Sequence, residues 1–184
     1  MQPTIVVLYH SSHGSVAAMA NEIADAIDAQ GGNAILRTFV AKNPEDIVIK
    51  KEELIQCDGL AFGTPTRFGM MASQAKAFWE TTSDLWLKGQ LIDKPACVFS
   101  SSSSMHGGNE ATLLNLSLPL LHHGMMLLGV PYEVPELLAT QTGGTPYGAS
   151  HVAGANNSKQ LSKDEIKICQ SVGQRLVKIT SKLK

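Results

Sequence analysis

The chain opens with a strand, a polar loop and a helix in immediate succession. Residues 5–8, Ile-Val-Val-Leu, form the apolar run of a buried strand, and residues 10–15, His-Ser-Ser-His-Gly-Ser, are polar. From Val16 on, apolar residues recur every three or four positions, as in an amphipathic helix. The free N–H groups and partial positive charge of a helix start can hold an anion without any lysine or arginine. This stretch therefore predicts a phosphate site.

The same loop limits the kind of phosphate. It lacks the Lys-Ser/Thr pair of a nucleoside-triphosphate loop and the three spaced glycines of a dinucleotide loop, so a small phosphate monoester is favoured. Serine and glycine also serve ordinary capping and turning in any strand-to-helix connection. The loop alone leaves that plainer interpretation open.

Length and composition narrow the function classes. The 184 residues suit one domain spanning residues 1–184. A net charge of −1 provides neither the basic surface of a nucleic-acid-binding protein nor the acidic face of a charge-steered electron carrier. We therefore expect small-molecule partners and no nucleic acid.

The cysteines and the amino end indicate the compartment. Three widely spaced cysteines, Cys57, Cys97 and Cys169, indicate reduced side chains rather than disulfides or a metal site. The start, Met-Gln-Pro, has no basic region, and its apolar run is too short for a signal peptide or a membrane span. The sequence predicts a cytoplasmic protein with no membrane span.

Strands and helices then alternate along the chain. Strands are predicted at 34–40, 60–63, 96–99 and 125–130, and helices at 45–56, 71–79 and 110–121, the last kinked or split at Pro119. Residues 82–92 and 131–158 read as irregular, and Ser162 to Glu165 form a capping box before a last helix. Five alternations predict an α/β fold with a five-stranded parallel sheet between two helical layers.

Three unusual loops follow the first, third and fourth strands. These loops begin at Ser11, Gly63 and Ser100; the last opens a five-serine run ending in Met-His-Gly-Gly, which we interpret as a flexible loop rather than a disordered linker. In parallel α/β sheets ligands bind outside the carboxyl ends of the strands. We expect one ligand to touch all three loops.

Five motifs, in order, resemble the WrbA family of flavodoxin-like NAD(P)H:quinone oxidoreductases. They are Leu-Tyr-His-Ser at 8–11 with Gly14, Phe-Gly-Thr-Pro-Thr-Arg-Phe-Gly at 62–69, His-Gly-Gly at 106–108, His-His-Gly-Met at 122–125 and Gly-Gly-Thr-Pro-Tyr-Gly-Ala at 143–149. The resemblance implies a flavodoxin-like three-layer fold, FMN as cofactor, NAD(P)H as co-substrate, a quinone as acceptor and a homotetramer built as a dimer of dimers.

The resemblance also assigns residues. For FMN it implies Ser11, Ser12, His13, Gly14, Ser15 and Val16 at the phosphate, Pro65, Thr66, Arg67 and Phe68 at the ring, Ser101, Ser102, Ser103, Ser104, Met105, His106 and Gly107 around ribityl chain and ring, and His122 near the flavin. Trp86 and His13 are the expected substrate-side contacts. No catalytic side chain is implied, because the flavin carries the chemistry.

The sequence departs from the family pattern at three places. His13 stands where many members have tyrosine, and Met70 where they have asparagine, so the pocket mouth is expected to differ. The segment between the second and third strands is short, which removes any family contact from there. We place part of the tetramer interface in residues 131–158.

Plainer interpretations remain for single residues. Arg67 fits an ordinary surface arginine and Trp86 fits the core. His122 and His123 point to opposite sides of a helix, so at most one faces the pocket, and Met105 and Met126 favour packing. No residues have metal-ligand spacing, and no Ser-His-acid set can be identified.

Two further functions compete with quinone reduction. In the favoured hypothesis NAD(P)H gives a hydride to FMN and leaves before a quinone takes two electrons in the same pocket, a ping-pong scheme. A flavodoxin-type electron carrier is the second, although the net charge of −1 counts against it. A regulatory protein that only binds the flavin is the third.

Overall fold

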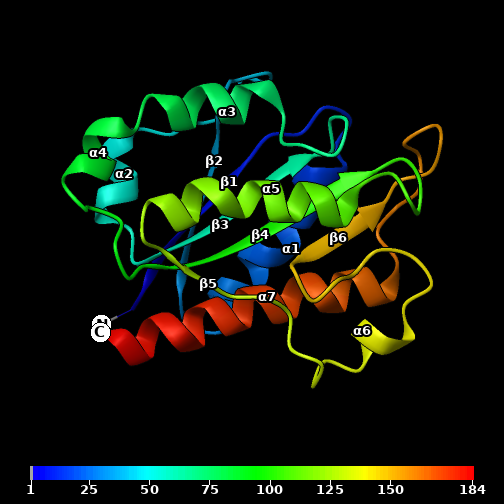
Figure 1. Ribbon diagram of the computed structural model, residues 1–184. Helices are drawn as coiled ribbons and strands as arrows, with labels where there is room; N and C mark the ends of the chain where they lie inside the picture. Colours follow the sequence, from blue (N-terminus) through cyan, green and yellow to red (C-terminus); the bar gives the residue numbers. More distant parts are fainter. Residues whose placement is uncertain (1) are drawn as a thin grey trace.

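The computed structural model describes residues 2–184 and contains one parallel sheet (Figure 1). The strands lie in the order β2-β1-β3-β4-β5, and β6 also pairs with β4. Their bounds are β1 Thr4–Tyr9, β2 Asn33–Thr38, β3 Gly59–Pro65, β4 Pro95–Ser102, β5 Met126–Leu127 and β6 Ala149–Val152. The strand order reverses between β1 and β3, which confirms the flavodoxin-like α/β fold.

Helices cover both faces of the sheet. They are α1 Ser15–Ala29, α2 Lys51–Gln56, α3 Ser73–Glu80, α4 Ser83–Leu87, α5 Asn109–His122, α6 Glu136–Ala139 and α7 Lys163–Leu183. The apolar sides of α1 and α7 form one core with Val7 of β1, and α2 to α5 form a second core with Phe62 of β3. Each central strand is buried on both faces, because every one of its side chains meets a helical layer.

The fifth position of the sheet is divided between two short strands. β5 pairs with Pro95 and Ala96 at the start of β4, whereas β6 pairs with the stretch from Phe99 to Ser102 at its end. The strand predicted at 125–130 is therefore only two residues long, and the stretch predicted as irregular holds a sixth strand and α6. The chain leaves the sheet after Leu127 and returns at Ala149 to complete the same edge.

Three other predicted elements differ in the structure. The helix predicted at 45–56 begins only at Lys51, because Asp46 accepts from the N–H groups of Lys42 and Asn43 and turns the chain. Residues 83–87 are helical rather than irregular. Pro119 does not split α5: the backbone continues past it, with His123 N–H donating to the Pro119 carbonyl.

The first three serines of the run belong to the sheet, and the loop predicted to begin at Ser100 begins only at Ser103. β4 extends to Ser102, and Ser100, Ser101 and Ser102 are buried. Flanking β3 and β6 pair with them, and the Ser100 hydroxyl donates to the Thr64 carbonyl at 3.0 Å. Within residues 2–184, no helix has both the length and the apolar character needed to cross a membrane.

Candidate FMN site

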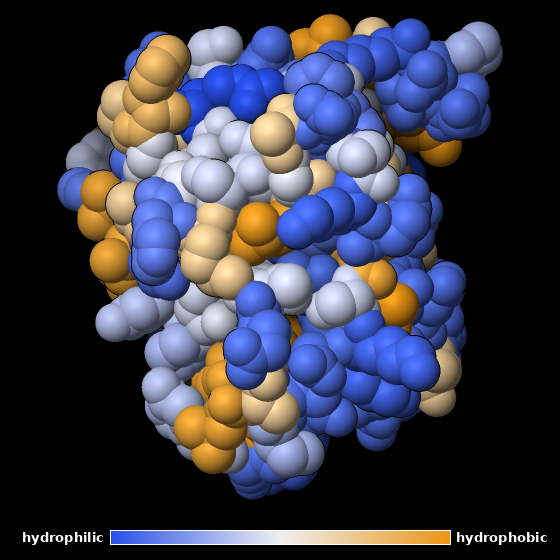
Figure 2. All heavy atoms as spheres, turned by 90° about the vertical axis from the view of Figure 1, so that its right-hand side faces the viewer, coloured by the Kyte–Doolittle hydropathy of each residue, from blue (hydrophilic) through white to orange (hydrophobic). Residues whose placement is uncertain are grey.

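The three loops expected to share one ligand do meet at the carboxyl edge of the sheet. A polar pocket of about 200 Å³ lies between them, lined by residues from all three. Figure 2 looks onto this edge, where residues of intermediate hydropathy gather beside hydrophilic ones. The lining comprises Ser11, Ser12, His13, Ser15, Val16, Pro65, Thr66, Arg67, Ser101, Ser102, Ser103, Ala155 and Asn157.

The amino end of α1 supplies the anion-binding character of this polar pocket. Gly14 has φ 94°, which turns the chain into the helix, and no side chain caps α1. Ser11 Oγ accepts from Gly14 N–H at 3.1 Å, which fixes the loop below the helix start. The first N–H groups of this fifteen-residue helix have no side-chain cap, and the hydroxyls of Ser11 and Ser15 line the pocket beside them. This combination is suited to a phosphate. The residues present therefore fit the phosphate of FMN.

A second and larger pocket adjoins the first. Its volume is about 970 Å³, and the residues Ser12 and Arg67 line both pockets. The side chains that enclose it come mostly from the loop after β3, from α3 and α4, and from the end of α5. Among them are Phe68, Met70, Trp79, Trp86 and Pro119, so this pocket offers flat and apolar surfaces for planar rings.

Arg67 bridges the loops after β1 and β3. Its guanidinium donates to Ser12 Oγ at 2.6 Å and to the Thr66 carbonyl at 2.9 Å. Phe68 follows in the left-handed conformation (φ 53°), with its side chain fully exposed at the pocket mouth. Arg67 is exposed, as an ordinary surface arginine would be, but its two hydrogen bonds hold it at the boundary of the two pockets.

Trp86 and the two histidines lie at the far end of the large pocket. The Trp86 side chain is 51% exposed and lines the pocket, so its assignment to the core is excluded. His122 and His123 both line the pocket, against the expectation that at most one would, because α5 ends there. His123 is the structural one: it is buried, lies 5.4 Å from the Trp79 ring and is hydrogen-bonded to Thr82.

Two polar residues to which the sequence analysis assigned no role, His10 and Lys42, contact this site. His10 is buried, lines the large pocket, and places Nε2 3.5 Å from Ser12 Oγ. Burial, together with nearby Lys42 and Arg67, lowers the pKa of His10 to about 4. Lys42 donates from Nζ to the Ser11 carbonyl at 2.7 Å, so the short segment between β2 and β3 does reach the phosphate loop.

Other predicted residues lie elsewhere. Ser104, Met105, His106 and Gly107 lie outside the linings of both pockets, in the turn after β4. The packing role expected of Met105 is wrong, since its side chain is 45% exposed. Ala155 and Asn157, which line the polar pocket, were missed, because only the sixth strand brings their loop to this edge. Within residues 2–184, no three His, Cys, Asp or Glu side chains gather where they could hold a metal ion.

Comparison with known proteins agrees with this geometry. Residues 4–133 match the family model described as NADPH-dependent FMN reductase. The NAD(P)H dehydrogenase (quinone) of Chromohalobacter salexigens is 40% identical, covering 97% of this chain and 98% of its own. That of Gluconacetobacter diazotrophicus is 36% identical, with the same coverage.

Solved structures share the fold. A flavodoxin, WrbA-like protein from Agrobacterium tumefaciens superposes with a TM-score of 0.76, at 23% identity over 100% of both chains. A flavodoxin from the domain Archaea gives 0.69, at 18% identity over 97% of this chain and 99% of its own. The resemblance of the motifs to WrbA is confirmed, and the chain belongs to the NADPH-dependent FMN reductase family.

Proposed function

We propose that this protein is an FMN-dependent NAD(P)H dehydrogenase (quinone), working by a ping-pong cycle in a single pocket. The observation that carries the proposal is the pairing of a polar, phosphate-sized pocket with a large apolar one, joined at Ser12 and Arg67. With FMN bound, a hydride from NAD(P)H is taken up and two electrons are then passed to a quinone. The named activity of the relatives from Chromohalobacter and Gluconacetobacter supports this function.

The residues of the two pockets divide the binding of FMN between them. The N–H groups at the start of α1 and the hydroxyls of Ser11 and Ser15 hold the phosphate. The stretch from Pro65 to Phe68 would face the ring system, and Ser101 and Ser102 of β4, with Ser103 just after it, would lie beside the ribityl chain. His122 belongs to the ring side. Ser104 to Gly107 keep a role only if the turn after β4 folds over bound cofactor.

The side chains then shape where substrates bind. The Arg67 guanidinium places a fixed positive charge beside the ring site, where it stabilises negative charge that develops on a reduced cofactor. Trp86 offers a flat wall on which a quinone or nicotinamide ring stacks, whereas His13, the other expected substrate contact, lies exposed at the polar pocket and does not line the large one. No proton-transferring pair is needed for this assignment, since the protein only binds, orients and shields.

Steady-state kinetics test the ping-pong scheme. NADH and a soluble benzoquinone are varied against each other with the FMN-loaded protein, and parallel double-reciprocal lines are expected. Intersecting lines would contradict a shared pocket. Flavin that is retained on desalting but not bleached by NADH would contradict the enzyme. A strongly stabilised one-electron-reduced flavin on photoreduction would then favour a flavodoxin-type carrier, and its absence would favour a flavin-binding regulatory protein.

We also infer a homotetramer, one domain per chain, in the cytoplasm. Large apolar side chains stand exposed around the mouth of the large pocket, and Phe68 is fully exposed there. Such a surface fits burial against a second copy. Three buried, unpaired cysteines fit a reducing compartment. Light scattering on the FMN-loaded protein tests the assembly: a monomeric mass at micromolar concentration would contradict it.

A further inference from the structure

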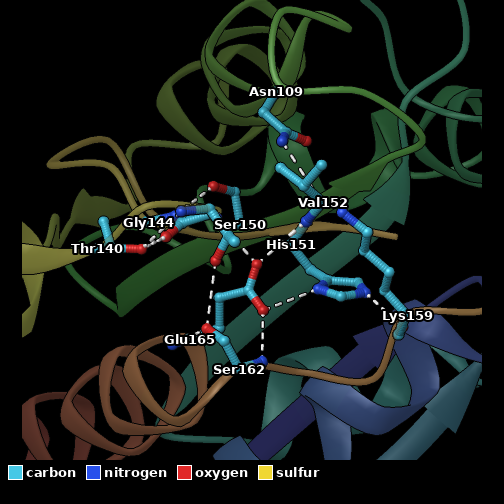
Figure 3. Close-up of polar contacts among 11 residues, drawn as sticks. Asn109, Thr140, Gly144, Ser150, His151, Val152, Lys159, Ser162 and Glu165 are labelled. Atoms are coloured by element: carbon cyan, nitrogen blue, oxygen red, sulfur yellow. Dashed lines mark hydrogen bonds and ion pairs between the residues drawn. The ribbon is translucent and has the colours of Figure 1, made fainter. Parts of the chain in front are cut away.

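A histidine and a glutamate form a fully buried, hydrogen-bonded pair between β6 and α7 (Figure 3). His151 lies in β6 and Glu165 in the first turn of α7; each side chain is 1% exposed, and His151 Nδ1 lies 3.0 Å from Glu165 Oε2. Glu165 also accepts from the N–H groups of Gly143, Val152 and Ser162, at 2.9, 3.1 and 2.7 Å. One carboxylate therefore ties together three separate chain segments.

The surroundings hold the Glu165 carboxyl group in its charged form. Burial raises the pKa of Glu165, but the hydrogen bonds from His151, Ser162 and Gly143 outweigh it and lower the pKa to about 2, so the carboxylate is ionised. The other ring nitrogen of His151, Nε2, lies 3.1 Å from the carbonyl oxygen of Lys159. A carboxylate and a carbonyl only accept, so a hydrogen on either ring nitrogen of His151 would meet an acceptor.

The hydrogen bonds of this pair converge on the loop that runs from residue 153 to 160. The loop joins β6 to α7, and two of its residues, Ala155 and Asn157, line the polar pocket. Lys159 N–H donates to the Ala153 carbonyl at 3.0 Å, which closes the loop on itself. His151 Nε2 then contacts the Lys159 carbonyl, which holds the second half of the loop in place.

Both ends of this loop are held as well. Val152 N–H, just before the loop, and Ser162 N–H, just after it, bind the two oxygens of Glu165. On the other side, Ala153 N–H donates to the Ser102 carbonyl at 2.8 Å, next to the serines that line the polar pocket. The position of the wall formed by Ala155 and Asn157 therefore depends on the His151–Glu165 pair.

We propose that His151 and Glu165 are positioning residues for the cofactor phosphate: they hold the 153–160 loop as the wall opposite the start of α1. This inference rests on the proposed placement of the phosphate in the polar pocket. Since neither side chain lines either pocket, they act through the loop. Loss of His151 is therefore expected to weaken binding of the phosphate and leave binding of the flavin ring unchanged.

The test compares FMN with riboflavin, which has the same ring and no phosphate. Both are titrated by fluorescence quenching into the FMN-free protein and into the variant His151→Gln, whose side chain donates to one partner but not to both. We expect FMN affinity to fall at least tenfold in the variant and riboflavin affinity to stay within twofold. Equal loss for both ligands, or no loss, would overturn the inference.

A matched control and a separate outcome keep the interpretation clear. Thr180→Val removes a buried hydrogen bond at the opposite end of α7 and should leave both affinities within twofold. If the unchanged protein binds riboflavin as tightly as FMN, the phosphate placement itself is wrong, and the inference falls with it. This outcome can be told apart from a failure of the His151–Glu165 inference alone, because it is seen in the unchanged protein without any variant.

Two measurements apply even if His151→Gln does not fold. In the ¹⁵N spectrum of the unchanged FMN-loaded protein, a ring N–H group of His151 is expected to give a slowly exchanging signal; rapid exchange of the ring N–H would overturn the assigned pair. The variant Ala155→Glu puts a negative charge on the same wall. It should lower the affinity for FMN at least tenfold and leave the affinity for riboflavin within twofold. Equal effects on the two affinities would contradict the role of the loop.

Discussion

Arg67 Nη2 and Ser12 Oγ lie 2.6 Å apart, joining the loops after β3 and β1 across the line where the two pockets meet. A hydrogen bond from a charged group contributes about 1.5–3 kcal/mol, roughly ten- to hundredfold in affinity. We therefore predict that Arg67→Ala weakens FMN binding by about that factor, measured by fluorescence titration. Arg67→Lys should recover only part of it, because lysine lacks the planar fork.

Arg37→Ala provides the control for this prediction. Arg37 is a partly buried arginine that pairs with Glu53, outside the linings of both pockets. Its loss should lower the melting temperature without changing FMN affinity. Equal FMN affinities of the Arg67→Ala variant and the unchanged protein would contradict the bridging role of Arg67.

Trp86 and Leu87 are neighbours on α4 with different surroundings. Trp86 lines the large pocket, whereas Leu87 is 76% exposed and does not. Trp86→Ala should raise the KM for a benzoquinone about two- to tenfold, since an aromatic contact contributes about 0.5–1.5 kcal/mol beyond its buried area. Leu87→Ala should leave KM unchanged. Equal effects of the two variants would show that Trp86 acts on the fold or the assembly and not on the substrate.

Gly63 leaves room for an aromatic ring in the centre of the sheet. A Cβ at Gly63 would lie 2.3 Å from Cε2 of Phe99, on the adjacent strand β4. Overpacking of this kind costs about 1–3 kcal/mol. Gly63→Ala is predicted to lower the free energy of unfolding in urea by that amount, and the added change Phe99→Leu to restore part of it. If Gly63→Ala left the free energy of unfolding unchanged, β4 would have to move away and make room for the added methyl group at no cost.

The sequence predicted the sheet and the phosphate loop because both depend on local patterns. The apolar run at Ile5 and the helical spacing from Val16 specify a strand and a helix whatever lies around them. Gly14 adds the left-handed turn between them. The three loops then meet at one edge, because parallel strands place their carboxyl ends together.

The missed features depend on pairings between distant residues. Ser100 to Ser102 are polar by composition and form a strand only because β3 and β6 pair with them. Nothing local marks residues 149–152 as the strand that completes the edge begun by β5. Ala155, Asn157 and His151 were missed for this reason. The capping box of Ser162 and Glu165 was predicted and is confirmed, but the pairing of Glu165 with His151 depends on β6 and α7 lying side by side.

Acid should destabilise the FMN-free protein in a window set by His10. The ordinary pKa of histidine, 6.5, applies to the unfolded chain, and burial with Lys42 and Arg67 lowers it to about 4 in the folded protein. The unfolded chain therefore binds the proton more tightly, and stability is lost as the pH falls from 6.5 towards 4. Between pH 7.5 and 5 the loss from this one group is about 2 kcal/mol.

His10→Asn isolates that contribution, since asparagine does not titrate and fits the buried position. Urea unfolding at pH 7.5 and at pH 5 should show a smaller difference for the variant than for the unchanged protein, by about 2 kcal/mol. His123, whose pKa burial and His122 also lower, acts in the same direction and stays in both proteins. Glu165 does not interfere with this comparison. Its pKa is lowered from 4.5 to about 2, so the stability that its carboxylate gives the fold is lost only as the pH falls below 4.5. Equal pH dependence in the two proteins would mean that His10 has the same pKa in the folded and unfolded chain, which would contradict the lowering by burial, Lys42 and Arg67.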